Sequence, residues 1–215
     1  MSGPFTDLRA IIVRREAAGD DSLSLKTLLE TGSFQSFKIP GVLKSQKRSS
    51  FHFYPGAIYR MIFRPAESRV IPKSSELLFS PFAEKQDYAR LAAVAELVRA
   101  ADYIRTAPDS AEYFLLLSEA LRSLPDEARS LESAVDAHYW QLLNFLGLAA
   151  ETEAGGEYVA YDLTSGFITA REMSGRPHSD FVLPIGWIKR AAGDLQAEAA
   201  SAACRELIRK FLSQL

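Results

Sequence analysis

The sequence Ala57-Ile58-Tyr59-Arg60-Met61-Ile62-Phe63-Arg64 contains the clearest alternation in the chain. Alanine, tyrosine, methionine and phenylalanine share one face, and the two isoleucines and two arginines share the other. Because successive side chains of a β-strand point to opposite sides of the sheet, this period of two predicts a strand. Pro55-Gly56 before the stretch and Pro65 after it mark where the strand is expected to begin and end.

Short runs of similar character fill the rest of the first 80 residues. Most of them end at turns rich in glycine, proline or aspartate, such as Gly19-Asp20-Asp21 and Pro40-Gly41. Runs of about four to eight residues separated by such turns predict a small antiparallel barrel or a sandwich. The further runs span residues 8–15, 22–29, 34–39, 51–54 and 68–79.

From Pro81 onward the apolar spacing becomes that of helices, in which residues three and four apart share a face. A short hairpin is expected around Thr164-Ser165-Gly166. The chain is therefore predicted to be α+β, with a barrel over residues 1–80 and a helical domain over 81–215 that carries the hairpin at about 151–179. Helices are expected at about 84–105, 109–124, 126–146, 180–194 and 196–215.

The composition is that of an ordinary globular protein, with 47% hydrophobic and 24% charged residues in a chain of 215. No apolar run approaches the roughly 18–20 residues of a membrane span, and the N-terminus shows no signal-peptide pattern. The single cysteine, Cys204, excludes an internal disulfide and a multi-thiolate metal site. We therefore expect a cytoplasmic protein without a cofactor and without a membrane partner.

Charge is distributed unevenly along the chain. Residues 31–66 hold six basic residues, seven aromatic residues and no Asp or Glu. Residues 1–80 carry 12 Lys and Arg against 7 Asp and Glu, a net charge of +5, whereas residues 81–215 carry 13 against 20, a net charge of −7. Positive charge among aromatic rings is what a polyanion with stackable bases requires, so the first part is predicted to bind nucleic acid.

The candidate phosphate-binding residues are basic side chains of this first part. Lys44, Lys47 and Arg48 lie in a Gly- and Ser-flanked loop, although a solvated loop without a ligand would have the same composition. Arg14 and Arg15 are neighbours on a predicted strand, so only one of them can face a given side. The complete candidate set is Lys38, Lys44, Lys47, Arg48, Arg14 and Arg15.

The aromatic residues of this part are more typical of a barrel core than of a stacking platform. Tyr54 and Tyr59 are the exceptions, because a phenolic hydroxyl prefers water or a partner, and both are expected to reach the surface. Arg60 and Arg64 share a strand face with Ile58 and Ile62, which fits phosphate binding and packing against the helices about equally well.

No catalytic constellation is visible. The three histidines, His52, His138 and His178, are scattered, and no metalloprotease, nucleophile-elbow or paired-carboxylate motif accompanies them. We therefore expect a protein that binds but does not catalyse.

Five segments follow one another along the chain in a recognisable order. They are Ala10-Ile11-Ile12-Val13, Ser22-Leu23-Ser24-Leu25-Lys26-Thr27-Leu28-Leu29, Gly41-Val42-Leu43-Lys44-Ser45-Gln46-Lys47-Arg48, Tyr139-Trp140-Gln141-Leu142-Leu143-Asn144-Phe145-Leu146-Gly147-Leu148 and Tyr161-Asp162-Leu163-Thr164-Ser165-Gly166-Phe167. In this order they resemble the RecO family of bacterial recombination mediators. The resemblance implies an N-terminal OB-fold barrel and a C-terminal helical domain. It also implies binding to single- and double-stranded DNA, strand annealing, and loading of recombinase onto DNA coated by single-strand binding protein, with RecR as partner.

The sequence departs from the family at its zinc module. Many members carry four cysteines after the third helix, but here the corresponding stretches, residues 153–156 and 169–172, contain none. Structural zinc sites of that kind need thiolates, so the metal is expected to be absent, together with any function that depends on it. A scaffold that keeps the fold but acts through protein partners is therefore the alternative function.

The family also implies that the helical domain receives the acidic, Phe-ended tail of single-strand binding protein. Such a tail needs a cation and an apolar pocket, and Arg122 and Arg129 lie beside Leu121, Leu124 and Leu131. The alternative is that both arginines only balance nearby glutamates on solvated faces.

Overall fold

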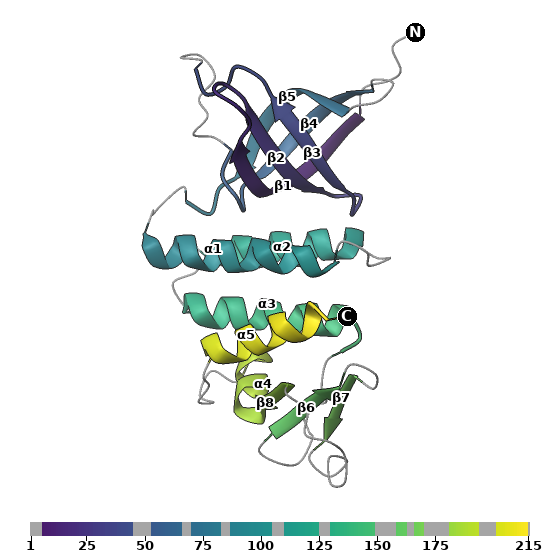
Figure 1. The fold of residues 1–215 in the computed structure, drawn as a ribbon, viewed down its shortest axis with the longest axis vertical. Coiled ribbons are helices and arrows are strands. Elements are labelled where there is room, and N and C mark those ends of the chain that lie inside the picture. Colours follow the sequence, from purple (N-terminus) through teal and green to yellow (C-terminus); the bar gives the residue numbers. More distant parts are fainter. Residues whose placement is uncertain are drawn as a thin grey trace. The chain divides into compact units, whose positions relative to one another are not determined.

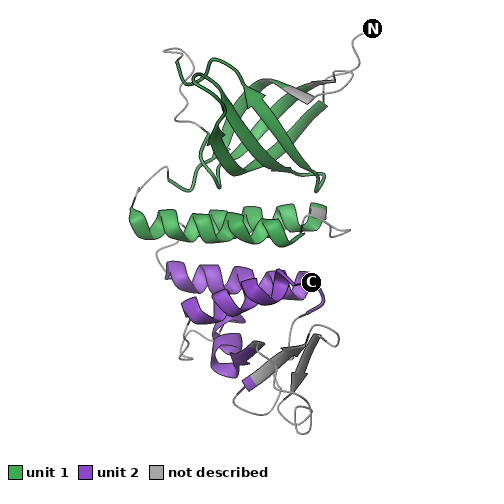
Figure 2. Cartoon of the chain, in the orientation of Figure 1, with its two compact units in different colours: residues 1–126 green, residues 127–215 purple. Residues whose placement is uncertain are grey.

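The computed structural model describes residues 6–44, 53–65, 70–82, 87–104, 110–124, 130–148, 158–162, 166–169, 181–193 and 201–214. The chain divides into two compact units, residues 1–126 and 127–215 (Figure 2). The change from strands to helices falls near residue 80 as expected, but the first unit extends beyond it and includes two helices. None of the helices in the described ranges is both long and apolar enough to cross a bilayer.

The first unit contains a five-stranded antiparallel sheet in the order β3-β2-β1-β4-β5 (Figure 1). The two edge strands, β3 and β5, also contact each other. The α+β class and the antiparallel sheet are therefore as predicted, although no strand forms at Phe53 and Tyr54. The strands are β1 (Thr6–Ala17), β2 (Leu23–Leu29), β3 (Phe34–Ile39), β4 (Ile58–Pro65) and β5 (Val70–Phe79).

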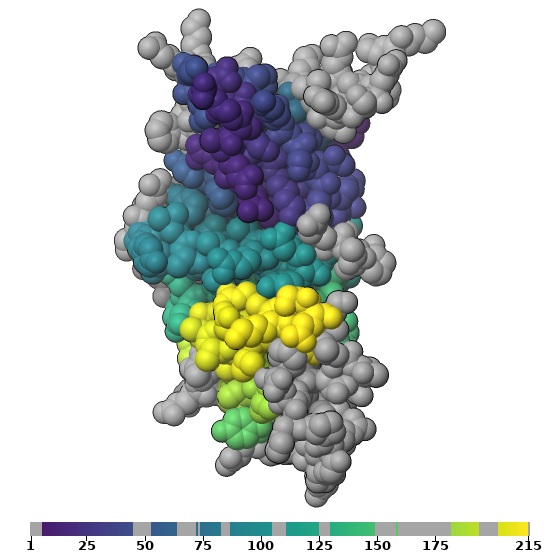
Figure 3. All heavy atoms as spheres, viewed as in Figure 1, coloured from purple at the N-terminus to yellow at the C-terminus, as the bar shows by residue number. Residues whose placement is uncertain are grey.

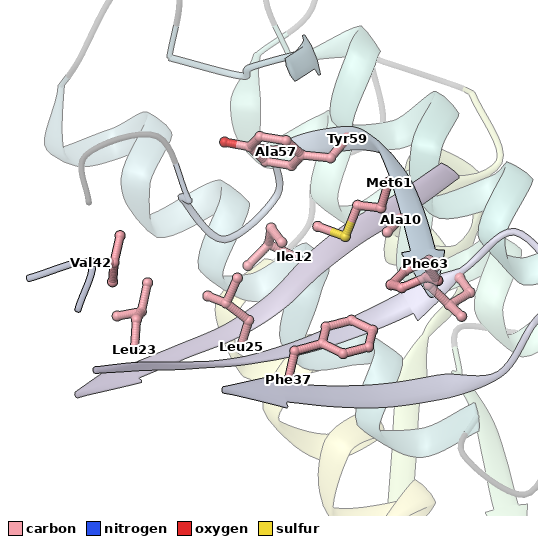
Figure 4. Packing of buried hydrophobic residues seen from close by; sticks show 11 residues of the cluster. Ala10, Ile12, Leu23, Leu25, Phe37, Val42, Ala57, Tyr59, Met61 and Phe63 are labelled. Atoms are coloured by element: carbon pink, nitrogen blue, oxygen red, sulfur yellow. The ribbon is translucent and has the colours of Figure 1, made fainter. Parts of the chain in front are cut away.

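One face of the sheet carries an apolar core (Figure 4). The alternation predicted for residues 57–64 is confirmed, because the alanine, tyrosine, methionine and phenylalanine of that stretch are all buried in this cluster. The prediction that Tyr59 reaches the surface is wrong, since only 2% of it is exposed. The buried members of the cluster are Ala10, Ile12, Leu23, Leu25, Leu29, Phe37, Val42, Ala57, Tyr59, Met61 and Phe63.

Two helices of the first unit, α1 (Tyr88–Ala100) and α2 (Ser110–Ser123), contact β1 and β2. A short 3-10 helix, η2 (Ala101–Ile104), follows α1. Asp87 caps α1 by accepting a hydrogen bond from the backbone N–H of Arg90 at 2.7 Å. Val94 of this helix is buried, whereas Leu91 is 50% exposed.

The second unit holds helices and a small sheet. The expected hairpin is present as β6 (Tyr158–Asp162) and β7 (Gly166–Thr169), and β8 (Phe181–Pro184) pairs with the other side of β6. A helix was expected from residue 180, but the strand β8 precedes α4, which begins at Ile185. The helices are α3 (Leu131–Phe145), α4 (Ile185–Ala191) and α5 (Ser201–Leu212).

Candidate nucleic-acid interface

Four of the candidate basic residues, Arg14, Arg15, Lys38 and Lys44, lie at one end of the five-stranded sheet, where β1 and β3 end and β2 begins. The segment after β3 lies against the β1–β2 turn, because the backbone N–H of Leu43 donates to the carbonyl oxygen of Asp21 at 3.0 Å. Lys38 at the end of β3 and Lys44 just after it are both exposed. The purple strands at the start of the chain are open to solvent on the face drawn in Figure 3. Lys47 and Arg48 lie outside the described residues.

Arg14 and Arg15 occupy opposite faces of this end of the sheet. The register of β1 and β2 places Arg14 opposite Lys26, and Arg15 opposite the core residue Leu25. A break in register between Ile12 and Arg14 sets this choice, because one extra residue in β1 reverses the side to which every later side chain points. Arg14 is exposed and forms an ion pair with Glu16 at 2.7 Å, whereas Arg15 is half-buried.

Three other cations of the sheet, among those that the structure describes, have a carboxylate partner on a neighbouring segment. Lys26 contacts Asp102 at 2.6 Å, Arg9 contacts Glu30 at 2.7 Å, and Arg60 contacts Asp7 at 2.6 Å. The hydrogen bond from Arg60 holds the pKa of Asp7 below its ordinary value. Neutralised pairs of this kind attract a polyanion less than a cation alone does.

Three of the predicted cations have no such partner. No carboxylate oxygen lies within 4.0 Å of the charged groups of Arg15, Lys38 or Lys44 in the described part of the chain. All three come from the sheet end at which the segment after β3 begins. This sheet end therefore presents positive charge that the described residues do not neutralise.

The aromatic residues divide between the core and this surface. Phe37 and Phe63 pack in the core with their ring centroids 5.1 Å apart, which agrees with the expected structural role. Phe53 and Tyr54 are only half-buried, and the Phe53 ring centroid lies 5.2 Å from that of Tyr59. The surface available for stacking among the described residues is thus smaller than the seven aromatics of residues 31–66 suggest.

Two acidic residues adjoin the candidate interface and were not considered in the sequence-based set. Asp20 and Asp21 are exposed in the β1–β2 turn, against which the segment leading to Lys44 lies. The Gly-Asp-Asp sequence predicts a turn, but only the contact from Leu43 to Asp21 shows which cation it adjoins. These carboxylates reduce the attraction of the interface for anions.

The predicted peptide-binding residues include two leucines of the first unit. Leu121 and Leu124 are buried, with 0% and 2% exposed, so their side chains are not open to a peptide. Arg122 is exposed, and its guanidinium carbon lies 5.2 Å from the centroid of the Phe79 ring. Arg129 lies outside the described residues, and the role of the two arginines in partner binding stays a prediction.

The second unit contains a buried polar cluster that sequence reasoning missed. Asp136 of α3, with 0% exposed, accepts a hydrogen bond from Arg205 of α5 at 2.5 Å. Arg190 of α4 and Glu132 of α3 complete the cluster, with N–O distances of 3.7 to 4.0 Å. Spacing on one helix gives no signal for it, since Asp136 and Arg205 are 69 residues apart. The cluster links three helices and has an evident structural role.

His138 and Cys204 of this unit are both buried. Burial lowers the pKa of His138 to about 4 and raises the pKa of Cys204 to about 11, so both side chains are uncharged near neutral pH. Within the described ranges, no group of three or more His, Cys, Asp and Glu residues is arranged to hold a metal ion.

Neither the protein-family models nor the curated proteins with which the chain was compared match it. The resemblance to RecO therefore stays a prediction.

Proposed function

We propose that this chain is a non-catalytic DNA-binding protein that anneals strands and mediates recombinational DNA repair, as its resemblance to RecO implies. One observation carries the proposal: Arg15, Lys38 and Lys44 lie at one end of the sheet without a carboxylate partner among the described residues. Phosphate oxygens satisfy such cations, and releasing the counterions of DNA favours their contact. Lys47 and Arg48 extend the same basic segment in the sequence.

The fold proposed for this function is a partly open barrel of the OB type. The sheet has five antiparallel strands, and its two edge strands contact each other, which supports this proposal. OB-folds bind oligonucleotides on the face of strands two and three and on the adjoining loops. The candidate cations lie in β1, in β3 and just after β3, close to that position.

The proposed mechanism is charge neutralisation. Two DNA strands repel each other, and a strip of cations that binds one backbone lowers the free energy needed to bring the second strand close. Contacts to phosphates carry no sequence information, so annealing by this route would act on any complementary pair. The half-buried Phe53 and Tyr54 would add contacts to bases without selecting them.

The partners proposed with this function are single- and double-stranded DNA, a RecR-like protein, and the acidic tail of single-strand binding protein. The net charge of −7 over residues 81–215 makes that part of the chain a poor DNA surface and leaves it to protein contacts. The proposed location is the cytoplasm, where such DNA transactions occur in bacteria, and no cofactor is required.

Fluorescence anisotropy with a labelled single-stranded oligonucleotide tests the proposal. If about five phosphates are contacted, log K should fall with log salt concentration with a slope of about −3.5, and replacing Lys38 and Lys44 by glutamine should reduce that slope by about 1.4. The matched control replaces Arg9 and Arg60, which are paired with Glu30 and Asp7, and should change the slope much less. Equal effects of both double variants would show that only net charge matters.

The alternative function is a scaffold that acts mainly through protein partners. The carboxylate partners of Arg9, Lys26 and Arg60 favour it, because they neutralise three further cations of the sheet. An unaltered protein that binds neither single- nor double-stranded DNA at low salt would support the scaffold and reject DNA binding.

A further inference from the structure

Arg15 is a cation on the core side of the sheet. Its partner in the β1–β2 register is Leu25, a core residue with 0% exposed, so the two side chains leave the sheet on the same side. Arg15 is half-buried there, and no carboxylate of the described residues lies within 4.0 Å of its charged group. Charged side chains on an apolar face are normally paired, so a bound anion would stabilise this arginine.

Tyr59 supplies a second polar group on the same face of the sheet. Its hydroxyl is buried and has no hydrogen-bond partner among the described residues, and a buried hydroxyl that loses its bonds to water without replacing them costs free energy. In Figure 4 the hydroxyl oxygen points away from Phe63, on the side of the view where Val42 lies. Burial raises the pKa of Tyr59 above its ordinary value, and the positive charge of Arg15 opposes this rise.

We propose that the guanidinium of Arg15 and the hydroxyl of Tyr59 form an anion subsite that takes one phosphate of a bound DNA single strand. This inference rests on the proposed function. A phosphate offers acceptor oxygens to both donors, and an arginine presents several N–H groups to it at once. Arg15 and Phe53 are half-exposed, so a strand would approach the subsite past these two side chains, whereas Tyr59 is buried.

Phe53 makes the subsite fit a nucleotide better than a free inorganic anion. Its ring lies 5.2 Å from that of Tyr59 and is half-exposed, so a base attached to the bound phosphate has an aromatic surface to contact. Residues 31–66 contain no Asp or Glu, so no carboxylate of that stretch competes with the phosphate for these two donors. A strand bound here would pass from the outer cations Lys38 and Lys44 toward the core face.

Three single variants test the subsite. Tyr59→Phe removes one hydroxyl and keeps the ring, and Arg15→Gln removes the inward cation. Arg14→Gln is the matched control, because it removes the same charge from the neighbouring residue on the opposite face. Each variant is titrated by anisotropy with a labelled short oligothymidylate, and separately with inorganic phosphate and with an abasic oligonucleotide of the same length as competitors.

The expected result is a loss of affinity for oligothymidylate of about tenfold in Arg15→Gln and about fivefold in Tyr59→Phe, with a smaller loss in Arg14→Gln. Tyr59→Phe should leave the melting temperature of the free protein unchanged or raised, because it removes a buried hydroxyl that lacks a partner. The abasic strand should compete less well than the normal strand, and inorganic phosphate should compete least.

Two results overturn the inference and differ in what else they reject. If the unaltered protein binds the oligonucleotide, but Tyr59→Phe binds like it and Arg15→Gln loses no more than Arg14→Gln, the subsite is rejected and DNA binding stands. If the unaltered protein binds no DNA, the proposed function fails together with the subsite. If inorganic phosphate competes as well as an unlabelled oligonucleotide does, the subsite binds free phosphate and the nucleotide is rejected as its ligand.

Discussion

Asp136 of α3 and Arg205 of α5 form a buried ion pair with an N–O distance of 2.5 Å. Truncating one partner of such a pair leaves the other charge buried without compensation. Asp136→Leu is therefore expected to lower the free energy of unfolding by about 4 kcal/mol. Both tryptophans of the chain, Trp140 and Trp187, lie within residues 127–215, so tryptophan fluorescence during urea unfolding reports on this unit.

The matched control for this pair is Glu206, whose side chain is 53% exposed and contacts Arg209 at 2.7 Å. Glu206→Gln should change stability little, because exposed pairs contribute little. A loss of stability in Asp136→Leu no larger than in Glu206→Gln would contradict the structural role of the cluster.

Gly56 allows the turn before β4 to pack closely on the helices. Its φ is +82°, and a Cβ atom built there would lie 2.6 Å from Val94 and 3.0 Å from Leu121. Gly56→Ala should destabilise the first unit by about 3 kcal/mol, through the unfavourable backbone conformation and the overlap. Gly41, with φ +69° and nothing within 4 Å of its Cβ position, is the control and should cost about 1 kcal/mol. Unfolding followed by circular dichroism would contradict this account if both variants lost equal stability.

Burial of His138 predicts a loss of stability in mild acid. Its pKa is lowered from 6.5 in the unfolded chain to about 4 in the fold, so the unfolded chain binds the proton first as pH falls. The stabilisation is complete above pH 6.5, declines as pH falls toward 4, and amounts to about 3 kcal/mol in total.

Urea unfolding at a series of pH values, followed by tryptophan fluorescence, measures this dependence. His138→Asn should remove the slope between pH 6.5 and 4, whatever its own stability. Asp7 and Glu206 have lowered pKa values in the fold, so the stability linked to them is lost only as pH falls below their ordinary values of 3.8 and 4.5, and the slope at higher pH reports on His138. A slope that persists in His138→Asn would assign the titration to another group.

The acidic β1–β2 turn is expected to weaken DNA binding. Replacing Asp20 and Asp21 by asparagine removes two negative charges beside the segment that leads to Lys44, and asparagine suits a turn equally well. Affinity for an oligonucleotide should rise about threefold at low salt and should return toward the original value as salt screens the charges. The same two-charge change at Glu112 and Glu119, exposed on α2, is the control for net charge. No difference between the two double variants would contradict a local effect.

The sequence by itself determined the α+β class, the strand at residues 57–64 and the position of the basic segment within residues 31–66. Each of these follows from the residues of one segment: the alternation that buries Tyr59, Met61 and Phe63 is complete within eight residues. A period of two needs no knowledge of the partner strands, because it depends only on strand geometry. The same pattern shows which residues face the core but not which polar atoms find a partner there.

Only the tertiary structure decided which cations remain available. Arg14 and Arg15 are equivalent in the sequence, and the break in register after Ile12 turns the first outward and the second toward the core. Arg60 meets Asp7 across 53 residues, and Arg205 meets Asp136 across 69. Such pairs form because packing distant segments brings their charges together, and no local spacing of residues records that encounter.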